Sequence, residues 1–261
     1  MLEAFYILVF LQALLGLYSL WEGLRWLQMA RRRLATHAGF YAPRVAVICP
    51  CKGAEPGLEQ NIAALAAFDY PSYELFFTLA SATDPAHNVL RRVTTPSKPA
   101  AQALNPSGMQ RAHVVIAGRP EGTSEKVNNL RAAVEQLSED FEVIVFTDSD
   151  GRPGRGWLGR LVAPLGDARL GAATTFRWHL PDRGGLWSAL GAAWNAAIIT
   201  VYGEHGRNFC WGGGTAIRRK TFEEIQALEF WRGSASDDYS LTLALRRAGR
   251  DILFVPECLV P

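Results

Sequence analysis

The chain has 261 residues, of which 49% are hydrophobic and 20% charged, so it can form a large core and is not a disordered or low-complexity protein. Its formal net charge is +2, and outside the first 40 residues acidic and basic side chains are equal in number, which argues against a nucleic-acid partner. The cysteines are few and show no CxxC spacing, so we expect reduced thiols in a cytosol-facing protein.

The first predicted element is a membrane anchor with a basic flank, over residues 1–33. The segment Ala4–Trp21 (AFYILVFLQALLGLYSLW) has no charged residue, and its continuation to Leu27 is long enough to cross the ~30 Å hydrocarbon layer. The arginines Arg31–Arg33 follow at once and predict, by the positive-inside rule, a single pass with the rest of the chain in the cytosol. A signal peptide fits less well because the N-terminus carries Glu3 rather than basic residues; a buried core helix is the other alternative.

After a linker over residues 34–43, strand-like and helix-like segments alternate through residues 44–261, the predicted catalytic domain. Short β-branched or aromatic runs predict strands over Arg44–Cys49, Tyr73–Ala80, His113–Ala117, Phe141–Thr147 and Gly171–Phe176. Apolar residues at helical spacing predict helices over Glu59–Phe68, Asp84–Val93, Ser124–Leu137, Gly156–Leu165 and Leu186–Tyr202, with an irregular stretch over Thr95–Gln110. This alternation predicts an α/β fold with a mostly parallel sheet flanked by helices, whose ligands bind beyond the carboxyl ends of the strands.

One predicted helix, Leu186–Tyr202, is apolar enough to suggest a second span. Its 17 residues are marginal for crossing a membrane, and Ser188, Asn195 and Thr200 interrupt it. We therefore expect an acceptor-side helix near the bilayer or, failing that, a buried helix.

Two aspartates follow the most strand-like segment. In extended backbone Asp148 and Asp150 would point to the same side, and two converging carboxylates suit a divalent ion that holds a diphosphate. The alternative is a polar turn, since DSDG is also a good turn sequence. The GxGxxG and GxxxxGK[ST] fingerprints are absent from the sequence, so a dinucleotide or P-loop site has little support.

Two predicted helix starts carry further charged residues. Asp237 and Asp238 open one helix, where they are candidates for catalysis or simply for capping. Lys126 opens another within EKVNNL, where a cation suits a phosphate, although a solvated helix face is the plainer alternative.

The order of these segments is more informative than any one of them. VAVICPCKG, LEQNI, DYPSYELFF, SATDP, EKVNNL, FTDSD, GGGTAIRRKTF and SDDYSL follow one another through roughly Val45–Pro261. In this order the chain resembles family 2 glycosyltransferases with a GT-A fold, most closely the ceramide glucosyltransferase-like branch. A bacterial hopanoid or glycolipid glycosyltransferase is an equally natural relative.

The resemblance implies an inverting transfer of a hexose from a nucleotide sugar, UDP-linked by preference, to a lipid hydroxyl at the cytosolic face of the membrane. It implies Asp238 as the general base, and a divalent cofactor, Mg²⁺ or Mn²⁺, on Asp148 and Asp150. The nucleotide-sugar site would comprise Pro50, Lys52, Ser81, Asp84, Lys126, Asn129 and Asp148. The donor–acceptor cleft would be lined by Trp211, Gly212, Gly213 and Asp237.

Two departures from the family pattern are visible. The acidic residue expected after the second strand is replaced by Ser81, with Asp84 three residues later as a possible substitute. The Q/R-x-x-R-W motif expected downstream of the base is absent, as are later membrane helices, so we expect the chain to be truncated at its C-terminus. A nucleotidyltransferase on a related sheet and a non-catalytic anchored binding domain therefore stay open as alternatives, and His179 and His205 are further candidates for meeting the acceptor.

Overall fold

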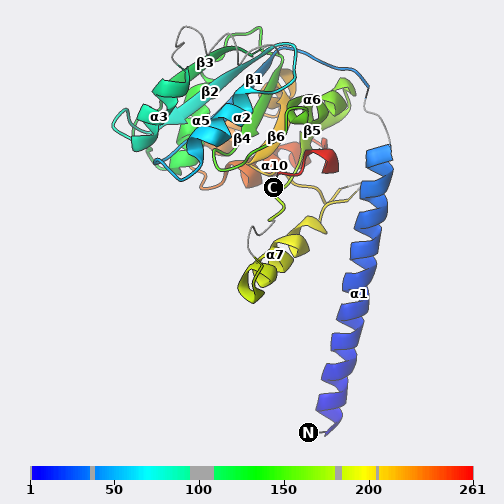
Figure 1. Ribbon diagram of the computed structural model, residues 1–261. Helices are drawn as coiled ribbons and strands as arrows, with labels where there is room; N and C mark the ends of the chain where they lie inside the picture. The colour runs from blue at the N-terminus through cyan, green and yellow to red at the C-terminus, as the bar shows by residue number, and fades with distance from the viewer. Residues whose placement is uncertain (1, 36–38, 95–108, 180–183, 204–205, 261) are drawn as a thin grey trace.

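A single seven-stranded sheet organises the computed structural model, which describes residues 2–35, 39–94, 109–179, 184–203 and 206–260 (Figure 1). The strand order is β3-β2-β1-β4-β6-β5-β7. The strands are β1 (Val45–Pro50), β2 (Tyr73–Leu79), β3 (Met109–Ile116), β4 (Val143–Thr147), β5 (Leu170–Thr174), β6 (Gly214–Arg218) and β7 (Asp251–Phe254). Among these strands only β6 runs antiparallel to its neighbours, so the predicted mostly parallel sheet is confirmed.

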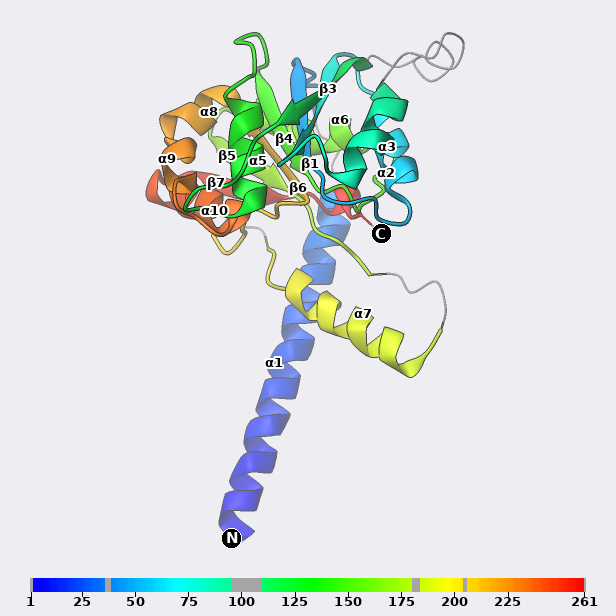
Figure 2. The same ribbon diagram turned by 90° about the vertical axis from the view of Figure 1, so that its left-hand side faces the viewer.

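Helices cover both faces of the sheet (Figure 2). The described helices are α1 (Leu2–Ala35), α2 (Leu58–Ala66), α3 (Pro85–Thr94), α5 (Glu125–Val134), α6 (Trp157–Val162), α7 (Leu186–Ile199), α8 (Arg219–Glu224), α9 (Ala227–Trp231) and α10 (Asp237–Arg247), with short 3-10 turns η1 (Ala163–Gly166) and η2 (Pro256–Cys258), and of these α1 and α7 lie away from the sheet. Successive strand residues point to opposite faces, so Val45 and Val47 pack with α2, α3 and α6 whereas Ala46 and Ile48 pack with α5 and α10. Both faces of β1 are buried, as a central parallel strand requires.

The helix α1 stands apart from the sheet domain and projects away from it (Figure 1). Among the described residues it is the one helix long and apolar enough to cross a membrane. Its buried residues are Met29 and Ala30 at the domain-proximal end and Glu22, which also pairs with Arg207 at 3.3 Å. One turn before Met29, Arg25 forms an ion pair of 2.5 Å with Glu22, as their i,i+3 spacing predicts.

Most predicted elements are present, and the differences have local causes. The strands β6 and β7 and the helices α8 and α9 were not predicted, because β6 begins within a run of glycines and the other three have only four to six residues. The strand β3 begins at Met109, earlier than expected, and most of the predicted irregular stretch, residues 95–108, lies outside the described residues.

Candidate active site at the carboxyl end of the sheet

Three charged side chains from three separate elements meet beyond the end of β4. The Nζ of Lys126, in the first turn of α5, lies 2.8 Å from Oδ1 of Asp148, which directly follows β4. The same Nζ lies 3.5 Å from Oδ1 of Asp237, the first residue of α10. The structure thus brings together one cation and two carboxylates that are far apart in the sequence.

The burial of this cluster changes the proton affinity of its members. Desolvation by itself would lower the pKa of Lys126, but the charges of Asp148 and Asp237 outweigh it and raise that pKa. Desolvation raises the pKa of Asp237, whose residue is only 7% exposed, and Lys126 offsets this in part. Lys126 is therefore a charged ammonium between two carboxylates. Of these, the buried Asp237 is the one whose ionised form is disfavoured by its surroundings.

Two glycines make room for the cluster. A Cβ on Gly212 would lie 2.6 Å from both Asp237 Oδ2 and Lys126 Nζ. A Cβ on Gly213 would lie 2.3 Å from the ring of Trp211 and 2.7 Å from Asp148 Oδ2. Residues 211–213 therefore form one wall of the cluster, and side chains at the two glycines would displace the charged groups.

Asp150 belongs to a neighbouring ion pair. Both of its carboxylate oxygens accept from the guanidinium of Arg177, with 2.8 Å between Asp150 Oδ2 and Arg177 Nη1. This hydrogen bond lowers the pKa of Asp150. The same guanidinium carbon lies 5.8 Å from the ring centroid of Trp211, within the range of a cation–π contact.

The two aspartates after β4 are held by different cations. The expectation that they share one side assumed extended backbone, but β4 ends at Thr147 and residues 149–150 form a turn. Carboxylates are the ligand type that Mg²⁺ and Mn²⁺ prefer, and such ions often keep only one or two of them beside phosphate oxygens. The donor chemistry fits, although within the described ranges no three His, Cys, Asp or Glu side chains gather around one point, and an ion would compete with Arg177 for Asp150.

Asp238 differs from its neighbour Asp237 in exposure. The N-cap of α10 is Ser236, whose Oγ accepts from the backbone N–H of Tyr239 at 3.1 Å. Asp238 accepts from that same N–H at 2.7 Å and from the Ser236 hydroxyl, and its residue is half-buried rather than buried. The helix therefore has a serine cap, and Asp238 lies nearer the solvent than Asp237.

The remaining residues expected around the nucleotide lie along the same edge of the sheet. Pro50 ends β1 and is half-buried, and the exposed Lys52 that follows forms an ion pair of 3.2 Å with Glu125, the neighbour of Lys126. Asp84 Oδ1 accepts from the N–H of Gly53 at 2.9 Å, which ties the loop after β1 to the start of α3.

Ser81 and Asn129 complete the expected nucleotide site, and His179 and His205 were the candidates for the acceptor. Ser81 is exposed and its hydroxyl lies 2.8 Å from that of Thr83. Asn129 is 2% exposed, and its buried Oδ1 has no hydrogen-bond partner among the described residues. His179 donates its backbone N–H to Asn195 Oδ1 of α7 at 3.2 Å, whereas His205 lies outside the described residues.

Sequence reasoning did not single out Arg177 as a site residue. The signal was available, because Arg177 comes directly after the predicted strand Gly171–Phe176 and so stands near the same edge of the sheet as Asp150. What could not be seen was the order of the strands, which leaves only β6 between the end of β4 and the end of β5 and so lets Arg177 reach Asp150.

The fold is that of a GT-A-type glycosyltransferase domain. The mannosyltransferase PcManGT of Pyrobaculum calidifontis, solved with GDP-Man and Mn²⁺, superposes with a TM-score of 0.59 at 19% identity over 95% of this chain and 66% of that one. At this identity the likeness concerns the fold.

The sequence comparisons identify the family. The profile of glycosyl transferase family 21 matches residues 4–259, so the chain belongs to this family. A ceramide glucosyltransferase of Gibberella zeae is 33% identical over 144 residues, which is 54% of this chain and 26% of the relative. Ceramide glucosyltransferase 1 of Caenorhabditis elegans is 24% identical over 79% of this chain and 43% of the relative.

These findings confirm the resemblance to the ceramide glucosyltransferase-like branch and the GT-A-type fold. The chain spans less than half the length of either curated relative.

Proposed function

We propose that this chain carries the donor site and the catalytic base of a membrane-anchored inverting glycosyltransferase. It would transfer a hexose from a UDP-linked sugar to the hydroxyl of a lipid. The observation that carries the proposal is the cluster of Lys126, Asp148 and Asp237 at the carboxyl end of β4, in a chain of family 21.

The donor would lie along the edge formed by the ends of β1, β2 and β4. Lys126 presents a charged ammonium in the first turn of α5, where the helix N-terminus also favours a phosphate. Lys52 is exposed, and its ion pair with Glu125 places it beside Lys126. Its side chain would turn toward the same diphosphate. Gly212 and Gly213 let the backbone approach the charged cluster closely, because a side chain at either position would overlap the groups proposed to meet the donor.

Asp238 would act as the base. An acceptor enters from solvent or membrane, so its hydroxyl can reach the half-exposed Asp238 more easily than the buried, ion-paired Asp237. The acceptor oxygen forms a bond to C1 of the sugar as its proton passes to Asp238, and the bond from C1 to the diphosphate oxygen breaks with its electron pair leaving on UDP. A single displacement inverts the anomeric centre and needs one carboxylate.

A divalent ion, Mg²⁺ or Mn²⁺, would be held by Asp150 and Asp148. When bound, such an ion neutralises the negative charge that develops on a departing diphosphate. The support is the chemistry of the two carboxylates after β4 and the Mn²⁺ in the mannosyltransferase of similar fold. The protein's own contribution is Arg177, which holds Asp150 in position and with which a bound ion would compete.

The helix α1 would be the membrane anchor, with the sheet domain in the cytosol. Its apolar residues project away from the domain, and Arg31–Arg33 lie at the domain end. A reporter fused after Arg33 should have cytosolic activity, and moving the three arginines ahead of Leu2 should weaken or invert this orientation. A reporter active only on the opposite side of the membrane would refute the topology.

Product analysis tests the reaction. The protein in detergent should release UDP only when a UDP-sugar and a lipid alcohol such as ceramide are both present, and the glycolipid should have the inverted anomeric configuration. Release of pyrophosphate from a nucleoside triphosphate and a sugar phosphate would point to a nucleotidyltransferase. Donor binding without any product would point to a non-catalytic binding domain.

A further inference from the structure

The helix α7 exposes a row of large apolar side chains. Leu186, Trp187, Leu190, Trp194 and Ile198 are all exposed, with Trp187 83% and Trp194 79% accessible. At 100° per residue these five side chains fall within one third of the helix circumference. A stripe of this kind normally faces a core, but here it faces away from the protein.

The opposite side of α7 is the side that contacts the domain. Asn195 and Ala196 are half-buried and Ile199 is buried, whereas the large residues point outward. The helix has no charged residue over its 14 positions. Two exposed tryptophans on an uncharged helix suit the boundary between lipid and water, where indole rings are enriched.

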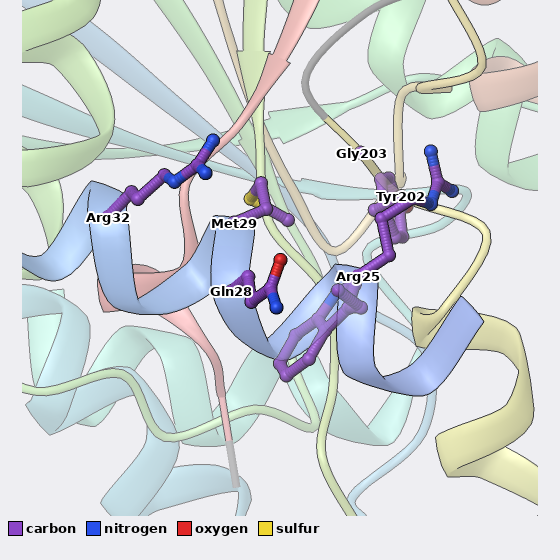
Figure 3. Close-up of a pocket in the computed structure, with 7 residues that line it drawn as sticks. Arg25, Gln28, Met29, Arg32, Tyr202 and Gly203 are labelled. Carbon is purple, nitrogen blue, oxygen red and sulfur yellow. The ribbon is translucent and has the colours of Figure 1, made fainter. Parts of the chain in front are cut away.

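The C-terminal end of α7 is fixed against α1. Ile199 and Tyr202 share an apolar cluster with Met29 of α1. Beside this contact lies a pocket of about 240 Å³ between α1 and the segment after α7, with Arg25, Gln28 and Arg32 on the helix side and Tyr202 and Gly203 opposite (Figure 3). The position of α7 along α1 is therefore set near residue 29.

From this contact α7 runs obliquely away from α1, on the side of the domain toward which α1 projects (Figures 1 and 2). Both views place α7 on the side of the sheet domain from which α1 projects, at the height of the domain-proximal part of α1 (Figures 1 and 2). The apolar run of α1 ends near Trp21, and Arg25 lies over its ring at 5.7 Å. The exposed stripe of α7 thus lies on the side of the domain on which the apolar run of α1 lies.

We propose that α7 lies in the lipid–water interface of the leaflet that α1 enters, with Trp187 and Trp194 among the lipids. This inference rests on the anchor in the proposed function. Both apolar surfaces lie on the same side of the domain, which favours a bilayer over a protein partner. The placement also serves the reaction, because His179 is bonded to Asn195 of α7 and lies two residues from Arg177 at the candidate active site.

Tryptophan quenching by lipids brominated in their acyl chains tests the placement in proteoliposomes. We expect the quenchable part of the emission to fall clearly in the variant Trp187→Phe/Trp194→Phe, because bromine quenches only rings that touch the acyl chains. The exposed positions of both residues should let this variant fold. The matched control is Trp21→Phe, which reports the anchor alone.

The outcomes separate the inference from the proposal on which it rests. A loss of quenchable emission in Trp21→Phe but not in the α7 variant would leave the anchor in place and overturn the position of α7. No quenching in the unmodified protein would refute both. If iodide in the water quenches Trp187 and Trp194, the helix is in solvent. If neither iodide nor bromolipid quenches them, the helix is covered by protein. Either result overturns the inference.

A second readout follows the acceptor. Trp194→Glu places a charge among the lipids and should raise the KM for a long-chain lipid acceptor at least several-fold, while the KM for the nucleotide sugar stays unchanged. Equal KM values for the acceptor in the variant and the unmodified protein would count against an interfacial α7.

Discussion

The two halves of the sheet contribute to the candidate site in different ways. The half formed by β1 to β4 is parallel throughout and supplies charged groups, Lys126 and Asp148 among them, just beyond its strands. The half formed by β5 to β7 contains the antiparallel β6 and supplies the glycine wall and the aspartates of α10. The site exists only where the halves join.

The antiparallel strand explains this junction. Because β6 runs against β4, its first residue pairs with the last residue of β4, Gly214 with Thr147. Gly212 and Gly213 thereby come to lie beside Asp148, and the hydroxyl of Thr147 donates to the carbonyl of Gly213 at 3.3 Å. A parallel strand in this position would have brought its far end here instead.

The largest expected effect lies on the second half, at Asp238. Asp238→Asn keeps the size of the side chain but cannot take a proton, and general base catalysis contributes about 10²–10⁴-fold to rate. We expect turnover to fall at least about 10²-fold. Donor affinity and melting temperature should change little, since Ser236 remains to cap α10.

The neighbouring Asp237→Asn is the matched control for this variant. Asp237 is buried against Lys126, where an acceptor hydroxyl reaches it less easily than Asp238. The substitution Asp237→Asn should therefore reduce turnover far less than Asp238→Asn. Equal small losses at both positions that follow the melting temperature would mean that the pair only supports the helix start, and a larger loss at Asp237 would move the base there.

The first half of the sheet could be predicted from the sequence far better than the second. Its strands β1, β2 and β4 are almost wholly buried, mainly apolar runs, and α5 begins at the predicted cap, where Ser124 Oγ accepts from Val127 N–H at 3.3 Å. The strand β6 starts in a glycine run and β7 has four residues, so neither gives a strand pattern.

Partner choice within the site was beyond the sequence for a physical reason. Lys126 meets both Asp148 and Asp237 only because strands distant in the sequence are ordered as they are. Which of two adjacent aspartates is buried depends on the helix phase of α10 against the sheet, since neighbours on a helix point about 100° apart.

The second prediction concerns Asp150, on the first half. Asp150→Ala should remove the stimulation of nucleotide-sugar binding by Mg²⁺ or Mn²⁺ and weaken binding about tenfold, a loss of ~1.4 kcal/mol, in calorimetry at saturating metal. Ser149→Ala is the control and should change binding less than about twofold, because the contact of Ser149 is made by its backbone carbonyl with Asn61. Donor binding that is insensitive both to EDTA and to Asp150→Ala would refute the metal site.

The third prediction tests the junction of the halves. In Gly213→Ala the new methyl group would overlap Trp211 and approach Asp148, so one of them must move. We expect kcat/KM to fall about tenfold, equivalent to ~1.4 kcal/mol, in steady-state assays of UDP release. Gly154→Ala is the matched control, since a Cβ there has no atom within 4 Å, and it should leave kcat/KM unchanged. Comparable losses in both variants would show that the glycine wall has no special role.

The smallest expected effect is a difference in pH dependence between the halves. Arg177 lowers the pKa of Asp150, so this pair stabilises the fold above the ordinary carboxyl range, and the stabilisation is lost as the pH falls through the lowered pKa. Burial raises the pKa of Asp237, so its ionisation destabilises the fold as the pH rises from the ordinary range, near 3.9, through the raised pKa.

The two asparagine variants should therefore respond to pH in opposite directions. Relative to the unmodified protein, the melting temperature of Asp150→Asn should fall more at pH 7 than at pH 3.5. The melting temperature of Asp237→Asn should rise at pH 7 and change little at pH 3.5. Salt separates the causes: the Asp150 side chain is 46% exposed, so 0.5 M NaCl should weaken its effect, while the desolvation of Asp237 should persist. Thermal melts at both pH values and both salt concentrations measure this. If the change in melting temperature varied with pH in the same direction in both variants, burial would not set the charge of Asp237. Lys126 would then neutralise both carboxylates of the cluster.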